Sequence, residues 1–201
     1  MLRDRDPSDP HWKAVELAQR AQMIRDVAAA DLEAAEAAYG AIHATTWHFR
    51  TARDEAFRAW DRLRAELGPK TIAAALREPP LTVLTLGPAS REFAPDRSGR
   101  WPLPEPVLSD APGALPTTPI LLIPIAGQTY RVLRVPGTPL APLIWHLTRL
   151  NPPLADGPYY ACRLPDGNAH CDCADWIYQR HQSSTQSLCK HLAALASLGW
   201  A

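Results

Sequence analysis

The sequence of 201 residues lacks the features of an exported or membrane-spanning protein. Its first ten residues are charged and contain no apolar core of the kind found in signal peptides. No apolar run approaches the ~20 residues that a membrane-spanning helix needs. The longest candidate, residues 120–125, is short and contains a proline. We therefore expect a cytoplasmic protein without a membrane partner.

The sequence also lacks net charge, because 21 basic and 21 acidic residues balance. Such a chain has no overall field that would draw it to nucleic acid or to an anionic lipid surface. It contains no phosphate-binding glycine loop, dinucleotide-type glycine motif, metalloprotease helix motif or nucleophile elbow. Residues 183–185, close to His181, are more typical of a polar loop than of a nucleophile beside a base. We expect a protein that is not an enzyme.

Cysteine is scarce, and the four cysteines of the chain do not suggest a disulfide-rich scaffold. Three of them follow one pattern, in which Cys171-x-Cys173 is separated by fifteen residues from Cys189-x-His191. Four ligands in two pairs have the stoichiometry of a closed, tetrahedral zinc site. We predict that these residues bind Zn²⁺. Because such a site leaves no position open for water, hydrolytic catalysis is disfavoured.

The residues around these ligands predict a β-β-α unit. Residues 159–164 form a strand-like run and residues 165–168 have turn composition, so residues 169–173 can return as a second arm. In extended backbone, residues i and i+2 share a face, so the first ligand pair can converge on one ion. The second pair requires Cys189 at or just before the first turn of a helix, with His191 inside that turn.

Other readings of these residues stay open. The three cysteines could be buried apolar residues, or a disulfide and one free thiol, although their pattern with His191 favours a metal. We expect Cys162 to be a small buried thiol, with a substitute ligand as the second interpretation. His170 and His181 could compete for the metal, but a solvated histidine is the commoner case.

The four ligands resemble the SWIM-type zinc finger, whose pattern is Cys-x-Cys, a variable gap and Cys-x-His on a β-β-α unit. Tyr160, the pair Asp175-Trp176 and the Lys190 segment that opens the helix are similar to flanking residues of that family. The resemblance covers residues 159–199, about a fifth of the chain, and does not extend to the first 140 residues. It implies a zinc-binding module that contacts DNA or protein and has no catalytic activity.

Residues 10–67 show the period of an α-helix. Asp9 and Pro10 form a helix start, and apolar residues, including Leu17 and Ile24, recur at steps of three and four as far as Leu67. Because this stripe keeps its register across residues 40–46, we favour one long helix, alone or in a coiled coil. Charge indicates a hairpin instead, since residues 26–40 carry four acids and no base, whereas residues 50–64 carry five arginines and three acids.

The rest of the chain predicts an α+β fold. Most of the 21 prolines lie between residues 78 and 158, after a short predicted helix at residues 71–77. Residues 93–119 have the composition of an irregular spacer. Residues 120–125 and 129–135 predict a hairpin. Residues 143–150 fit a strand or a helix, and their alternation favours a strand that pairs with residues 159–164.

We therefore expect three regions. Residues 1–70 form a helical, coiled-coil-like region, and residues 71–118 form a short helix and a proline-rich linker. Residues 119–201 form a small β-rich domain in which an antiparallel sheet carries the finger at residues 159–199.

Two functions stay open at this point. The first is a non-catalytic zinc-binding protein whose finger binds nucleic acid or protein, which the resemblance and Arg163, Arg180 and Lys190 favour. Against nucleic acid, residues 159–201 hold three bases and three acids, so no strong phosphate-binding face is visible and no nucleic-acid-binding residue is assigned. The second is an adaptor that forms a homo-oligomer through the N-terminal helix and has a purely structural zinc site.

Overall fold

The computed structural model describes residues 8–86, 95–96, 98–105, 120–152, 157–179 and 188–201. The chain begins with three helices, α1 (Pro10–Tyr39), α2 (Ala44–Leu67) and α3 (Pro69–Ala75). Six strands follow, β1 (Leu84–Leu86), β2 (Ile120–Ile125), β3 (Gln128–Val135), β4 (Leu143–Arg149), β5 (Tyr159–Arg163) and β6 (Ala169–Cys171). Two short helices, α4 (Ala174–Gln179) and α5 (Lys190–Ser197), complete the α+β fold that the sequence predicts. No helix in these described ranges is long and apolar enough to cross a membrane.

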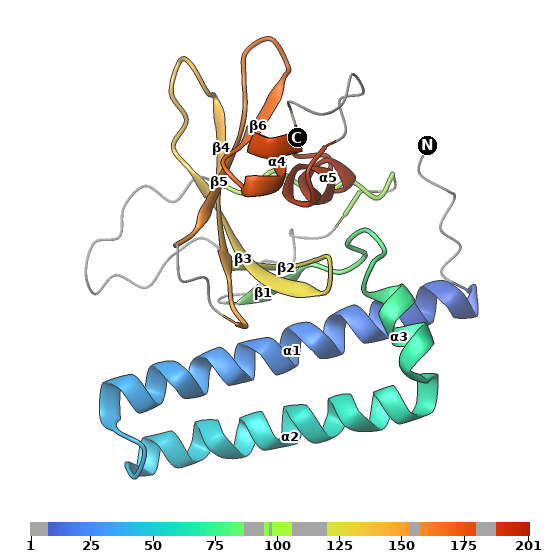
Figure 1. Ribbon diagram of the computed structural model, residues 1–201, viewed down its shortest axis with the longest axis vertical. Coiled ribbons are helices and arrows are strands. Elements are labelled where there is room, and N and C mark those ends of the chain that lie inside the picture. The colour runs from blue at the N-terminus through green and yellow to red at the C-terminus, as the bar shows by residue number, and fades with distance from the viewer. Residues whose placement is uncertain (1–7, 87–94, 97, 106–119, 153–156, 180–187) are drawn as a thin grey trace.

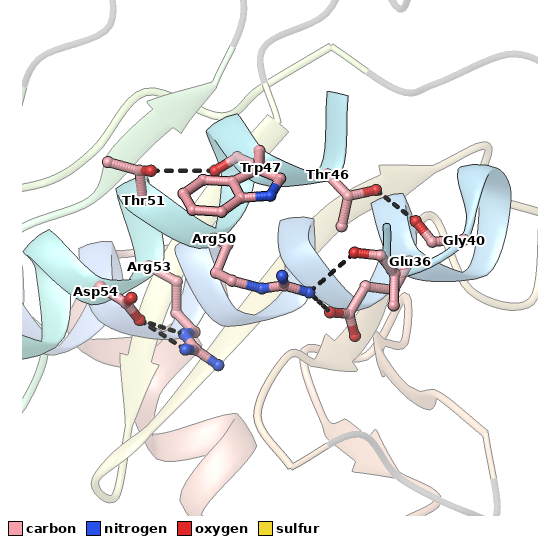
Figure 2. A network of polar contacts seen from close by, with 9 residues as sticks. Glu36, Gly40, Thr46, Trp47, Arg50, Thr51, Arg53 and Asp54 are labelled. Carbon is pink, nitrogen blue, oxygen red and sulfur yellow. Dashed lines mark hydrogen bonds and ion pairs between the residues drawn. The ribbon is translucent and has the colours of Figure 1, made fainter. Parts of the chain in front are cut away.

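The N-terminal region is a helical hairpin, so the interpretation that we favoured, one long helix, is wrong. α1 ends at Gly40, whose φ of 84° breaks the helix, and α2 begins after the N-cap residue His43. Figure 2 shows two contacts that close the turn, the hydrogen bond from Thr46 Oγ1 to the Gly40 carbonyl (2.8 Å) and the ion pair between Arg50 and Glu36 (2.8 Å). The complementary charges of residues 26–40 and 50–64 indicated this hairpin correctly. The apolar stripe indicated one long helix, because it keeps its helical register across the turn.

The buried face of α1 differs from the predicted apolar stripe. Leu17 and Ile24 belong to the stripe but are 44% and 47% exposed, whereas Gln19, Gln22 and Asp26 are buried. These three polar residues lie three and four positions apart and therefore share one face of the helix. That face packs on the sheet and on the segment that leads to β1, where polar side chains find backbone partners.

Polar contacts connect α1 to the sheet. Gln22 Nε2 donates a hydrogen bond to the carbonyl of Gly127, and Thr129 Oγ1 donates one to Asp26 Oδ2 over 2.8 Å. The other oxygen of Asp26 is 2.7 Å from Arg25, whose guanidinium lies over aromatic rings of α2. The buried carboxylate is therefore paired and hydrogen-bonded, as burial of a charge requires.

Gln19 fastens α1 to the segment after α3. Its Nε2 donates to the carbonyls of Glu78 (3.1 Å) and Pro79 (3.3 Å), and its Oε1 accepts the Leu81 N–H (3.0 Å). Replacing Gln19 with alanine leaves these buried backbone groups without partners, so we expect the free energy of unfolding to fall by about 1–3 kcal/mol. Urea unfolding followed by circular dichroism measures the change. The exposed neighbour Arg20 is the control, because Arg20→Ala should cost less than ~0.5 kcal/mol, and equal stability of the two variants would contradict the prediction.

The six strands form one antiparallel sheet in the order β1-β2-β3-β4-β5-β6. The predicted hairpin between β2 and β3 is confirmed, and its two-residue turn has positive φ at both Ala126 (48°) and Gly127 (75°), as in a type I′ turn. The predicted pairing of β4 with β5 is also confirmed. The sequence did not predict β1, because three residues are too few to show an alternating pattern.

The two faces of the sheet pack against different helices. One face buries Tyr130, Trp145 and Leu147 against α5, and the ring of Trp145 stacks on that of Trp200 at 4.9 Å. Thr129 points to the other face, because neighbouring strand residues alternate, and it contacts α1 there. Figure 1 shows α4 and α5 on one side of the sheet and the helical hairpin below β2 and β3.

Residues 93–119, expected as a spacer, lie mostly outside the described residues. In the described part, the backbone N–H of Trp101 donates to the carbonyl of Leu198 over 3.1 Å. The carbonyl of Trp101 accepts a hydrogen bond from Trp200 Nε1 over 3.0 Å. This portion therefore packs on the C-terminal end of α5.

Candidate metal centre

The second predicted ligand pair lies at a helix start, as the sequence indicated, whereas only Cys171 of the first pair lies on the predicted strand. Cys171 is the last residue of β6, and Cys173 lies just before α4, where its carbonyl accepts the Ile177 N–H. Cys189 is the N-cap of α5, with extended backbone angles (φ −64°, ψ 163°), and His191 lies in the first turn of that helix. The sequence did not predict α4, whose six residues are too few to establish a helical period.

The fold brings the four side chains together in the interior. Cys171, Cys173, Cys189 and His191 are all buried, and their ligand atoms lie within 4.8 Å of one another. The Sγ atom of Cys171 is 3.7 Å from Nδ1 of His191. Three thiols and an imidazole at these separations could hold one metal ion.

The three thiols have unequal pKa values. A hydrogen bond from the Cys171 thiol lowers the pKa of Cys189 to about 4. Donation of that hydrogen bond, together with burial, raises the pKa of Cys171, and burial raises the pKa of Cys173. The N-terminus of α5 also favours a thiolate at Cys189.

His191 is held between two tyrosines. Its ring centroid is 4.6 Å from that of Tyr159 and 5.1 Å from that of Tyr130. These rings fix the orientation of the imidazole, so that Nδ1 faces Cys171. The opposite nitrogen, Nε2, is buried without a hydrogen-bond partner among the described residues. The sequence shows no signal for the contact with Tyr130, because this residue lies on β3, far along the chain from His191.

The other candidate ligands are not part of this cluster. Cys162 pairs with His170 across β5 and β6, whereas Ala161 pairs with Cys171. Because adjacent strand residues alternate, Cys162 and His170 lie on the face of the sheet opposite Cys171. Cys162 is a half-buried free thiol whose pKa is raised by burial. His181 lies outside the described residues.

Comparison with known proteins adds no relative. No protein-family model, no curated protein and no solved structure matches the chain.

Proposed function

We propose that the chain is a non-catalytic zinc-binding protein, in which residues 159–199 form a SWIM-type zinc finger that presents a surface to nucleic acid or protein. The observation that carries the proposal is the gathering of three thiols and one imidazole within 4.8 Å. In a tetrahedron with zinc–sulfur bonds of ~2.3 Å and a zinc–nitrogen bond of ~2.1 Å, a sulfur and a nitrogen ligand lie about 3.6 Å apart. The 3.7 Å between Cys171 Sγ and His191 Nδ1 fits this geometry.

The surroundings support a structural role for zinc. The protein supplies four ligands, and all four are buried, so neither an open coordination position nor access for water is evident. The ligands come from β6, from the start of α4 and from the start of α5, so one ion would fasten three elements together. Three thiolates around Zn²⁺ leave a net charge of about −1, which Lys190 and the N-terminus of α5 partly offset.

Elemental analysis of the purified protein tests the proposal. We expect about one zinc ion per chain, because structural zinc sites bind tightly at neutral pH. Cys189→Ala should abolish binding, and Cys162→Ala is the matched control because this thiol lies outside the cluster. Absence of zinc from the native protein, or equal zinc content in the two variants, would refute the proposal.

A second candidate function is an adaptor that forms homo-oligomers through the helical hairpin. The observation that favours it is the exposure of Leu17 and Ile24, which lie seven residues apart on one face of α1. A second copy could cover this face. Sedimentation at several protein concentrations tests the idea, since replacing both residues with glutamate should convert an oligomer to a monomer. A native protein that is monomeric at all concentrations would exclude this function.

A further inference from the structure

The face of the sheet opposite the metal centre carries a row of aromatic side chains. His146 on β4 pairs with Tyr160 on β5, and their ring centroids are 5.1 Å apart. His170 on β6 shares this face and its ring lies 5.8 Å from that of Trp176 on α4. The row therefore crosses three neighbouring strands, and at the edge strand β6 it meets Trp176, which packs on the core of the other face.

The row is accessible to solvent. Tyr160 is 48% exposed, whereas His146, His170 and Trp176 are partly exposed. α1 contacts the same face of the sheet at Thr129, near the turn between β2 and β3. Its hydrogen bonds to the sheet are thus made at the turn and not at the aromatic row.

The strands that carry the row present no negative charge that would repel a polyanion. Strands β3 to β6 contain no aspartate or glutamate, and three of their four arginines lie on the face of the metal centre. The fourth, Arg131, pairs with Thr148, two residues from His146, and so lies on the same face as the aromatic row. The neighbouring carboxylate of Asp172 accepts a hydrogen bond from the backbone N–H of Tyr160 over 2.8 Å and so holds the edge of this strand.

We propose that this face binds single-stranded nucleic acid, with bases stacked on Tyr160 and the neighbouring rings. Every base offers a π-face, and stacking on aromatic side chains supplies sequence-tolerant affinity. A duplex hides its base faces within the helical stack, so it cannot use such a row. The inference rests on the proposed function, because the metal centre fixes β6 and α4, which carry His170 and Trp176.

Fluorescence anisotropy with the zinc-loaded full chain tests the proposal. The probes are labelled oligothymidylate and oligouridylate of about 20 nucleotides, longer than the site of a single binding module, and a mixed-sequence duplex. We expect either single strand, or both, to bind and the duplex to bind at least tenfold more weakly. The two single strands distinguish DNA from RNA as the source of the bases.

Variants of exposed tyrosines make the test specific. Tyr160→Ala should weaken binding by about five- to a hundredfold, the effect of losing one stacked base. Tyr160→Phe, which keeps the ring, should retain most of the affinity of the native protein for the single strand. Tyr39→Ala is the matched control, because Tyr39 is 56% exposed on the hairpin, away from the sheet face, and should not alter binding. Zinc content and circular dichroism of each variant establish that it is folded.

The failures of this inference and of the proposed function are distinguishable. If the protein contains zinc but binds neither single strand, or if duplex binds as tightly, the inference about this face is wrong while the zinc proposal stands. Equal weakening by Tyr39→Ala and Tyr160→Ala would also overturn it. Absence of zinc from the native protein refutes the proposed function instead.

Discussion

Replacing Cys189 with alanine is expected to unfold more of the chain than residues 159–199. Cys189 caps α5, and Leu192, Leu195 and Leu198 in and after this helix belong to the same core as Leu147 on β4. Structural zinc contributes about 10–16 kcal/mol to the folding of zinc-finger peptides. Even a fraction of this matches the whole stability of a typical domain, about 5–15 kcal/mol. Loss of the ion should therefore disorder the sheet face that α5 covers.

The helical hairpin should survive this substitution. Val15 and Ala18 on α1 form a separate apolar cluster with Trp60 on α2 and Ile72 on α3. Limited proteolysis with mass spectrometry should thus show cleavage throughout residues 120–201 and protection of residues 10–75. Far-UV circular dichroism should retain most of the helical signal. A chelator should reproduce the pattern in the native protein, and a protected C-terminal region in Cys189→Ala would contradict the prediction.

The sheet and the metal centre were largely predictable because their signals are local. The turn at Ala126 and Gly127 separates two apolar runs, and each ligand pair consists of residues two positions apart. Backbone geometry alone then places Cys189 at a helix start, as the structure confirms. The four side chains meet because the segment with Cys171 and Cys173 and the segment with Cys189 and His191 are neighbours in the fold.

The buried face of α1 could not be predicted in this way. Gln19 and Asp26 are polar, and their partners Leu81 and Thr129 lie on segments far along the chain. A periodicity argument identifies Leu17 and Ile24 as part of an apolar stripe, but it does not show which face of the helix the rest of the fold covers. The cost of burying polar groups is offset only by hydrogen bonds that the tertiary structure creates. Such hydrogen bonds do not change the spacing of apolar residues in the sequence, so a periodicity argument cannot detect them.

Trp200→Ala should destabilise the protein by about 3–5 kcal/mol, the usual cost of truncating a buried aromatic residue. The Trp200 ring is buried and stacks on Trp145 at 4.9 Å with an interplanar angle of 13°. Its Nε1 donates to the carbonyl of Trp101, and its backbone N–H donates to the carbonyl of Leu195 over 2.9 Å. Alanine keeps the backbone contact and removes the stack and the indole hydrogen bond. Chemical unfolding monitored by near-UV circular dichroism measures the loss.

Two further variants distinguish the contribution of the Trp145–Trp200 stack to stability from the effect of removing any tryptophan. Trp200→Phe retains an aromatic ring against Trp145 but cannot donate to Trp101, so it should be destabilised by less than the alanine variant. Trp47→Ala removes a tryptophan that is 62% exposed, and it should cost less than ~0.5 kcal/mol. If Trp200→Ala were as stable as Trp47→Ala, the stacked pair would contribute little to the core. Since Trp200 is not one of the four clustered Cys and His residues, a folded Trp200→Ala protein should keep the metal content of the native protein, which distinguishes its effect from that of Cys189→Ala.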